Sequence, residues 1–321
     1  MASTSGLVPP PDTRLPFFSY GLFQPSEIPF RQIAGFVRNW EKAECAGSLV
    51  LRDGLPLLDD SIGGHAPGVL LRFNDGDAEG AYSVISRFEP KYLYKWKKSP
   101  VRVSEGGKTE SANVLVGKRL DMGTVPLEEP GWKSANDPVL NEGLAEVRRL
   151  ADADGRERFH SVPPEHFDWG RLFRLEMGYL FLWTVLERYV TLTQGPSLEA
   201  GEKVKALGED GSFGAALKPS VERTHQIFDS RDPSDDAWLD PHDPVKSARY
   251  YYLVRSNVTH RGKGTFRDGE TVRRSLNELL SIVDKLVEEI RSVSELKGEG
   301  DRSASEDPDT LGGATPQGSH D

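Results

Sequence analysis

The most informative stretch of this chain is a basic segment in its C-terminal half, Arg255-Ser256-Asn257-Val258-Thr259-His260-Arg261-Gly262-Lys263-Gly264. It places an arginine, an amide and a histidine within six residues. Arginine binds phosphate oxygens through a rigid fork of donors, and histidine gains or loses a proton near neutral pH. These residue types are suited to cleaving a phosphodiester without a metal ion.

Helices are predicted on both sides of this segment. Upstream, Asp243 is a favourable N-cap and Pro244 is a favourable first helical residue. An earlier helix is predicted from about Trp169 to Leu192, where apolar residues follow the helical period. Downstream, a long apolar stripe repeats at three- and four-residue steps, at Val272, Leu276, Leu279, Val283, Leu286, Ile290 and Val293. We therefore expect a helical bundle in the C-terminal half.

The spacing of Arg255 and His260 sets a geometric condition on any site that they share. A helix turns about 100° per residue, so two positions five residues apart point about 140° away from each other. The two side chains converge only if the helix ends between them. We expect such an end, because Thr259 is β-branched and Gly262 and Gly264 follow it.

This arrangement resembles the HEPN superfamily of helical-bundle proteins, over about residues 165–297. Many members carry an R-x(4–6)-H motif at the end of the third core helix and act as metal-independent ribonucleases. The resemblance implies that Arg255 stabilises the scissile phosphate and that His260 transfers a proton. It also implies that Asn257 orients the phosphate or the histidine, and that two bundles pair as a homodimer with one composite site.

One residue next to the arginine departs from the motif, and two basic residues after the histidine add to it. Family members commonly have a polar residue directly after the arginine, whereas here Ser256 takes that place and Asn257 comes next. The basic residues that follow the histidine, Arg261 and Lys263, are candidate phosphate contacts.

Local charge agrees with an RNA partner although the overall charge does not. The chain has 40 basic and 50 acidic residues and a net charge of −10, which argues against a broad polyanion-binding surface. Between Lys246 and Arg274, however, there are eight basic residues and two acidic ones. A small basic focus fits a site that engages a few phosphates. The alternative is a solvated helix face with ordinary ion pairs.

The first third of the chain is predicted to be a small β-barrel or α+β domain. Short apolar runs separated by Gly, Asp, Asn and Pro clusters indicate strands, at residues 17–21, around Val50, and at 68–73, 101–103 and 113–117. One helix is expected from Ala78 to Glu89. It ends there because Pro90 disfavours helix in the residue before it. The expected fold is therefore α+β, a mixed β-barrel followed by an all-α bundle.

The order of these elements is similar to the gamma-glutamylcyclotransferase-like fold, over about residues 15–125. The resemblance rests on Tyr20-Gly21 after the first strand and on Glu89 after the helix. It implies that the Tyr20-Gly21 loop binds a gamma-glutamyl-like ligand and that Glu89 is the acid and base of lactam closure. The chain departs from the family pattern at Leu22, Phe23, Ser86 and Pro90. The fold resemblance is therefore stronger than the resemblance in activity.

Both barrel residues have simpler alternatives. Glu89 is either a base whose pKa is raised in an apolar pocket or a helix-terminal carboxylate exposed to water. Tyr20 is either a site residue or an aromatic core residue at the end of a strand.

The expected organisation along the chain has five parts. They are a flexible N-terminus (1–14), the barrel domain (15–125), a connector (126–164) with a short helix at about 141–153, the bundle (165–297) and a disordered acidic tail (298–321). The glycine-rich residues 201–214 are expected to form a loop between bundle helices.

No metal site and no cofactor are expected. His160, His166, His225 and His242 are widely spaced and lack cysteine partners, and no phosphate-cradling glycine motif occurs. The one cysteine, Cys45, fits a reducing cytoplasm. No apolar run approaches the roughly 20 residues that cross a bilayer, so no membrane partner is expected.

Three functional hypotheses follow. The first is a metal-independent endoribonuclease in the bundle, with the barrel as a ligand-binding, sensing or regulatory module, in the setting of a toxin or an antiphage defence. The second is a gamma-glutamylcyclotransferase-type enzyme in the barrel, with the bundle serving for dimerisation. The third is a regulatory scaffold without catalysis. The first is favoured, because the departures from family pattern fall mainly on the barrel.

Overall fold

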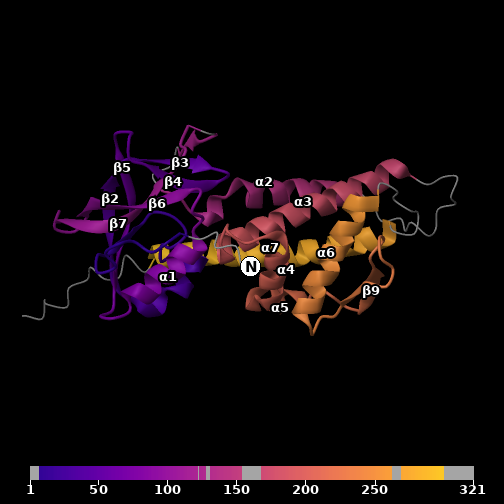
Figure 1. Ribbon diagram of the computed structural model, residues 1–321. Helices are drawn as coiled ribbons and strands as arrows, with labels where there is room; N and C mark the ends of the chain where they lie inside the picture. The colour runs from indigo at the N-terminus through magenta and orange to yellow at the C-terminus, as the bar shows by residue number, and fades with distance from the viewer. Residues whose placement is uncertain (1–6, 122, 128–130, 154–167, 262–268, 300–321) are drawn as a thin grey trace, which may run out of the picture.

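The computed structural model describes residues 7–121, 123–127, 131–153, 168–261 and 269–299. A β-barrel forms one end of the molecule, and a long array of helices extends from it (Figure 1). The predicted α+β class, with a barrel before a set of helices, is confirmed. Residues 1–6, most of the predicted tail and part of the predicted connector lie outside the described residues.

Five strands close the barrel, in the order β1-β5-β2-β6-β7. They are β1 (Phe17–Ser19), β2 (Val37–Ala46), β5 (His65–Phe73), β6 (Tyr94–Val103) and β7 (Thr109–Gly117). Neighbours pair antiparallel except β1 and β7, which close the barrel in parallel. Inward-facing small and apolar residues, among them Phe18, Cys45, Leu70 and Val114, fill its interior.

A small sheet in the order β4-β3-β8 lies beside the barrel. Its strands are β3 (Ser48–Arg52), β4 (Leu55–Asp59) and β8 (Val125–Pro126). The turn between β3 and β4 places Asp53 and Gly54 at φ of 52° and 74°, a left-handed conformation that glycine adopts without strain. Helix α1 (Ala78–Phe88) ends before Glu89-Pro90, as the sequence predicts.

The helical part begins earlier in the chain than expected. Helix α2 (Pro138–Asp152) lies within the predicted connector, yet it packs along α3 (Trp169–Gln194). Its apolar face, formed by Leu140, Leu144 and Val147, is buried in the core that α3 also lines. Short 3-10 turns η1 (Ile28–Gln32), η2 (Ala34–Phe36) and η3 (Ser134–Asn136) lie in the segments between strands and before α2.

The rest of the helical part follows α3. It comprises α4 (Ala200–Glu209), α5 (Gly211–Leu217), α6 (Pro244–Arg261) and α7 (Gly269–Glu299), with a hairpin of β9 (His225–Phe228) and β10 (Asp236–Leu239) before α6. The loop predicted for residues 201–214 is wrong, because the polar glycine-rich segment forms α4 and α5. A reciprocal capping box of Glu199 and Glu202 starts α4, and Asp210 caps α5.

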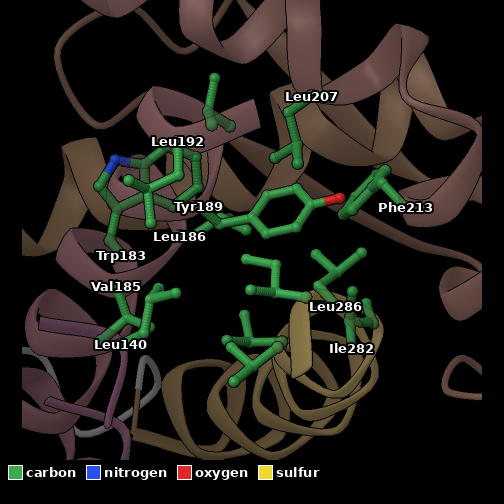
Figure 2. Packing of buried hydrophobic residues seen from close by; sticks show 14 of the residues in the cluster. Leu140, Trp183, Val185, Leu186, Tyr189, Leu192, Leu207, Phe213, Ile282 and Leu286 are labelled. Carbon is green, nitrogen blue, oxygen red and sulfur yellow. The ribbon is translucent and has the colours of Figure 1, made fainter. Parts of the chain in front are cut away.

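One buried cluster joins the barrel side to the bundle. Figure 2 shows Tyr189 of α3 at the centre of its helical part, with Leu207 and Phe213 on one side and Ile282 and Leu286 of α7 on the other. The Tyr189 hydroxyl donates to Asp210 at 3.1 Å, so this aromatic residue is buried without an unpaired polar group. The predicted apolar stripe of α7 is buried except for the half-buried Val293.

Helix α7 extends to the barrel end of the molecule. Near its C-terminal end, Glu289 pairs with Arg31 of η1 at 2.9 Å, and Arg291 donates to Asn141 of α2 at 2.8 Å.

Within the described residues, no helix is both long enough and apolar enough to cross a membrane.

Candidate functional site

Helix α6 carries the R-x4-H segment, and its start follows the prediction. The Asp243 carboxylate accepts from the Lys246 backbone amide at 3.0 Å, and Pro244 is the first helical residue. Its end does not follow the prediction, because the helix continues through Arg261. Thr259 stays inside the helix, where its hydroxyl donates to the Arg255 carbonyl at 2.9 Å.

The continuous helix separates the two catalytic candidates. Arg255 and His260 therefore point about 140° apart around α6, and the expectation that they converge on one face is wrong. The Arg255 side chain is half-buried and that of His260 is exposed. Neither side chain has a hydrogen bond or ion pair to another described residue. The side chain of Arg261 and the whole of Lys263, the candidate phosphate contacts, lie outside the described part of the chain.

Asn257 holds the β9–β10 hairpin. Its side chain is buried, its Oδ1 accepts from the Ser230 amide at 2.9 Å, and its Nδ2 donates to the Phe228 carbonyl at 2.9 Å. Both ends of the amide are thus engaged by hairpin backbone and not by Arg255 or His260. Asn257 positions the hairpin against α6.

A second pair of contacts strengthens this attachment. Arg231, within the hairpin, pairs with Asp229 at 2.8 Å and reaches the buried Ser256 hydroxyl at 3.4 Å. The hydrogen bond from Arg231 lowers the pKa of Asp229 to about 2. The residue after the arginine of the motif, Ser256, therefore also contacts the hairpin.

The sequence-based prediction omitted a group of buried polar atoms around Tyr251, the residue one turn before Arg255. Among the described residues, seven buried side-chain nitrogen or oxygen atoms lack a hydrogen-bond partner, and three of the seven belong to Tyr251, Arg274 and Glu278. Tyr251 lies one turn before Arg255 on α6, whereas Arg274 and Glu278 lie one turn apart on α7. Four-residue spacing to Arg255 is the sequence signal that identifies Tyr251. Arg274 and Glu278 lie between the apolar positions of α7, where charged residues are common. The sequence therefore does not distinguish them from the other charged residues of that helix.

An exposed apolar stripe runs along the first half of α3. Its side chains are spaced four residues apart and are 43% to 57% exposed, namely Trp169, Phe173, Met177 and Phe181. Residues at this spacing share one helix face. The stripe belongs to the helix that contacts α6 near the candidate site, because Tyr179 donates to the Tyr251 carbonyl at 2.8 Å.

In the barrel, the predicted residues Tyr20, Gly21 and Glu89 do lie together. They line one small cavity with Tyr94 and Pro56. The Tyr20 hydroxyl donates to the Leu115 carbonyl at 2.7 Å and accepts from the Leu58 amide at 3.2 Å. Tyr20 is thus both a core residue and a wall of the cavity.

Glu89 is buried, so the alternative of a water-exposed carboxylate is excluded. Its side chain is 4% exposed, and its Oε2 has no hydrogen-bond partner among the described residues. Burial raises the pKa of Glu89 to about 8, so the carboxyl group carries a proton at neutral pH. A protonated carboxyl in an apolar wall is able to donate a hydrogen bond to a ligand.

The cavity is too small for a gamma-glutamyl ligand in this conformation. The space open to the centre of a water molecule is about 20 Å³, which is room for a single water. Leu22 and Phe23, which depart from the family pattern, are buried against it. Phe23 packs edge-on against Phe88 at 5.0 Å, and Gly195 at the end of α3 lies against Phe88. The cavity is therefore closed by side chains of the N-terminal part, and the end of α3 supports one of them, Phe88, from behind.

No cluster of three or more His, Cys, Asp or Glu side chains that could hold a metal ion occurs among the described residues.

No family model matches the chain, and the searches of curated proteins and of solved structures found no match.

Proposed function

We propose that the chain is a metal-independent endoribonuclease whose chemistry lies on α6. The observation that carries the proposal is a pair of side chains on this helix, the half-buried arginine and the exposed histidine, neither of which pairs with another described residue. A half-buried arginine without an acidic partner among the described residues is available for an anion, and its fork of donors fits a phosphate.

The reaction needs three events at one phosphate. The 2′-oxygen of ribose bonds to phosphorus as its proton leaves, the bond from phosphorus to the 5′-oxygen breaks, and that oxygen takes up a proton. The products are a 2′,3′-cyclic phosphate and a free 5′-hydroxyl. Arg255 would donate to the non-bridging oxygens, where negative charge develops. His260 would move one of the two protons.

Because Arg255 and His260 diverge on one helix, the arginine of one copy would act with the histidine of another. The exposed α3 stripe supports this pairing. A fully buried aromatic residue covers about 150–250 Å², so four half-exposed side chains offer about 400 Å² per copy, or about 800 Å² over both. That is roughly half of a standard interface, and a polar rim would supply the rest.

The barrel would regulate the bundle. Its neutral Glu89 beside Tyr20 supports recognition of one small polar ligand, once Leu22 and Phe23 move aside. A cyclotransferase in the barrel is the second candidate, and the shared cavity of Tyr20, Gly21 and Glu89 is the observation that favours it.

The test is cleavage of labelled single-stranded RNA by the full-length protein in EDTA. Arg255→Ala and His260→Ala should each reduce cleavage at least 100-fold, with unchanged melting temperature. Arg249→Ala and His242→Ala, an arginine on the same helix and a histidine just before it, are the matched controls. Strict metal dependence, or full activity in both catalytic variants, would overturn the proposal.

The barrel is tested separately with gamma-glutamyl dipeptides. Release of 5-oxoproline that Glu89→Gln abolishes would make the barrel the enzyme.

A further inference from the structure

We propose that Glu278 is the base that takes the 2′-hydroxyl proton beside Arg255, in a polar recess formed with Tyr251 and Arg274. The inference rests on the proposed ribonuclease function. It assigns the proton transfer from the 2′-hydroxyl, which is the one that His260 does not carry out.

The first step of the argument is the concentration of unpaired polar atoms. Tyr251 is fully buried, and its hydroxyl faces Glu278, yet this hydroxyl, Nε of Arg274 and Oε2 of Glu278 all lie outside hydrogen-bond geometry with any described group. Leaving a buried polar group unpaired is costly, so three such groups on neighbouring elements need a physical reason. Toward RNA, Nε of Arg274 offers a donor and Oε2 of Glu278 an acceptor, while the Tyr251 hydroxyl faces the carboxylate. A ribose 2′-hydroxyl next to a phosphate offers the complement, one donor beside several acceptors.

The second step is the placement of this group relative to Arg255. Helices α6 and α7 are consecutive and pair where Tyr250 and Ser275 hydroxyls meet at 3.3 Å. On α6, Tyr251 lies against Glu278 of α7. Tyr251 also faces Arg274, so one residue of α6 meets two residues that lie one turn apart on α7. Arg255 follows Tyr251 by four residues on the same face of α6 and therefore lies next to this group.

The third step is the chemistry of the carboxyl group. Burial raises the pKa of Glu278 to about 7, while Arg274 on its own helix opposes this rise. The groups that face Glu278 from other elements are Tyr251 of α6, Tyr179 of α3 and Glu222 ahead of β9. A base whose pKa lies near the working pH is ionised in part of the molecules and holds a proton strongly once it accepts one.

In the proposed step, the 2′-hydroxyl gives its proton to the Glu278 carboxylate as its oxygen bonds to phosphorus. Arg255 and Arg274 would neutralise the phosphate, and the leaving 5′-oxygen would take its proton from His260 of the second copy. Glu278 then returns its proton to water. Glu278 and Arg274 are half-buried residues, and the RNA strand would approach through their exposed parts, whereas Tyr251 is fully buried and faces the carboxylate from behind.

The experiment measures cleavage of labelled RNA in EDTA from pH 5 to 9, together with binding of the uncleavable 2′-deoxy analogue. Glu278→Gln should reduce kcat at least 100-fold, remove the acidic limb of the profile near pH 7 and leave binding of the analogue unchanged. Glu288→Gln, an exposed carboxylate on the same helix, should behave like the unmodified protein.

Tyr251→Phe provides the second variant. It removes the phenol that lowers the pKa of Glu278, so the acidic limb should move to higher pH with folding preserved. If Glu278→Gln fails to fold, this shift decides the matter, and an unmoved limb overturns the inference. Loss of activity in Arg255→Ala with full activity in Glu278→Gln would overturn the role of Glu278 and leave the ribonuclease standing. An unmodified protein that cuts no RNA would overturn both.

Discussion

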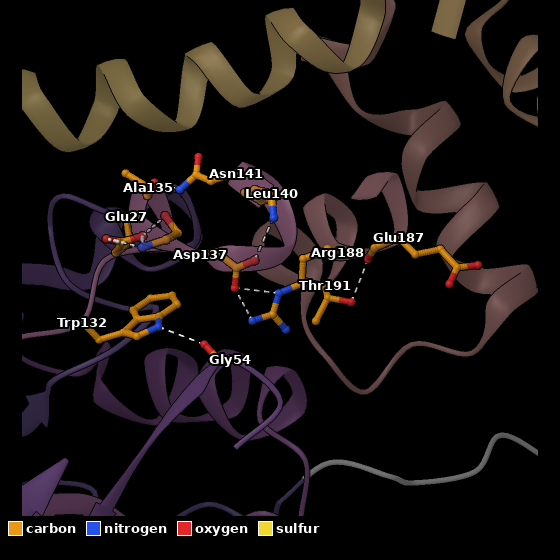
Figure 3. A network of polar contacts seen from close by, with 11 residues as sticks. Glu27, Gly54, Trp132, Ala135, Asp137, Leu140, Asn141, Glu187, Arg188 and Thr191 are labelled. Atoms are coloured by element: carbon orange, nitrogen blue, oxygen red, sulfur yellow. Dashed lines mark hydrogen bonds and ion pairs between the residues drawn. The ribbon is translucent and has the colours of Figure 1, made fainter. Parts of the chain in front are cut away.

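Asp137 and Arg188 form a buried ion pair where the barrel meets the helices. Asp137 begins α2, where its Oδ1 accepts from the Leu140 amide at 3.1 Å, and Nε of Arg188 on α3 donates to its Oδ2 at 2.9 Å. The β3–β4 turn lies on this pair, since a Cβ on Gly54 would come within 2.5 Å of the Arg188 guanidinium. Trp132 donates to the Gly54 carbonyl at 3.0 Å (Figure 3). The pair therefore fixes two helices and the β3–β4 turn of the small sheet together.

Arg188→Ala should destabilise the protein by about 3–5 kcal/mol, because it leaves the Asp137 carboxylate buried without its partner. Chemical denaturation monitored by circular dichroism measures this change. Arg149→Ala is the control, since solvent screens the exposed pair that Arg149 forms with Glu146, and its loss should change stability little. Equal effects of the two substitutions would show that the junction pair has no special role.

Glu89→Gln should change how stability depends on pH. The pKa of Glu89 is raised to about 8 from an ordinary value of 4.5, so the folded protein retains a proton that the unfolded chain has lost between these values. Its contribution to stability is complete below pH 4.5 and is lost as pH rises through about 8, at on the order of 1 kcal/mol per pH unit. Glutamine removes this dependence, so the variant should gain stability relative to the unmodified protein at pH 8.

Thermal melting between pH 5 and 8.5 measures the effect. Glu105→Gln, an exposed carboxylate in the β6–β7 turn, should show the same pH dependence as the unmodified protein. Parallel curves for Glu89→Gln and the unmodified protein would mean that Glu89 is ionised in the folded state.

The sequence predicts those elements whose apolar pattern is strong. The stripe of α7 and the helix of Trp169 to Leu192 follow helical periodicity closely, and both are confirmed. Strand β2 was missed because charged residues cover its outer face and only the small Ala43 and Cys45 point inward, so no apolar alternation marks it. Helices α4 and α5 were missed because the segment is rich in glycine, which disfavours helix. The capping carboxylates stabilise the two helices enough to offset this effect, and composition alone does not reveal it.

The candidate sites divide in the same way. The resemblance to the gamma-glutamylcyclotransferase-like fold implied one site for Tyr20, Gly21 and Glu89, and the three residues line one cavity. The course of α6 was not predicted, because glycines mark a helix end only to within a few residues. The engagement of Asn257 by the hairpin depends on β9 and β10, whose short polar strands carry no distinct pattern.

Asn257→Ala should separate a structural role from a catalytic one. It removes two hydrogen bonds that fix the β9–β10 hairpin, so the free energy of unfolding should fall by about 1–3 kcal/mol. Cleavage of RNA should fall less than tenfold at a temperature where the variant stays folded. Denaturation and cleavage are measured on the same sample. A 100-fold loss of kcat with unchanged stability would instead assign Asn257 a direct part in the chemistry.

Replacing Phe173 and Met177 together by glutamate should convert a dimer into a monomer. The two side chains occupy the middle of the exposed α3 stripe, and four like charges buried at a two-fold interface would oppose pairing. Sedimentation at micromolar concentration should show a dimer for the unmodified chain and a monomer for the variant. Ile62→Glu, at an equally exposed apolar position in the barrel, should remain dimeric. Cleavage should disappear with the dimer, because Arg255 and His260 of one helix do not meet. A monomeric variant with full activity would contradict the composite site.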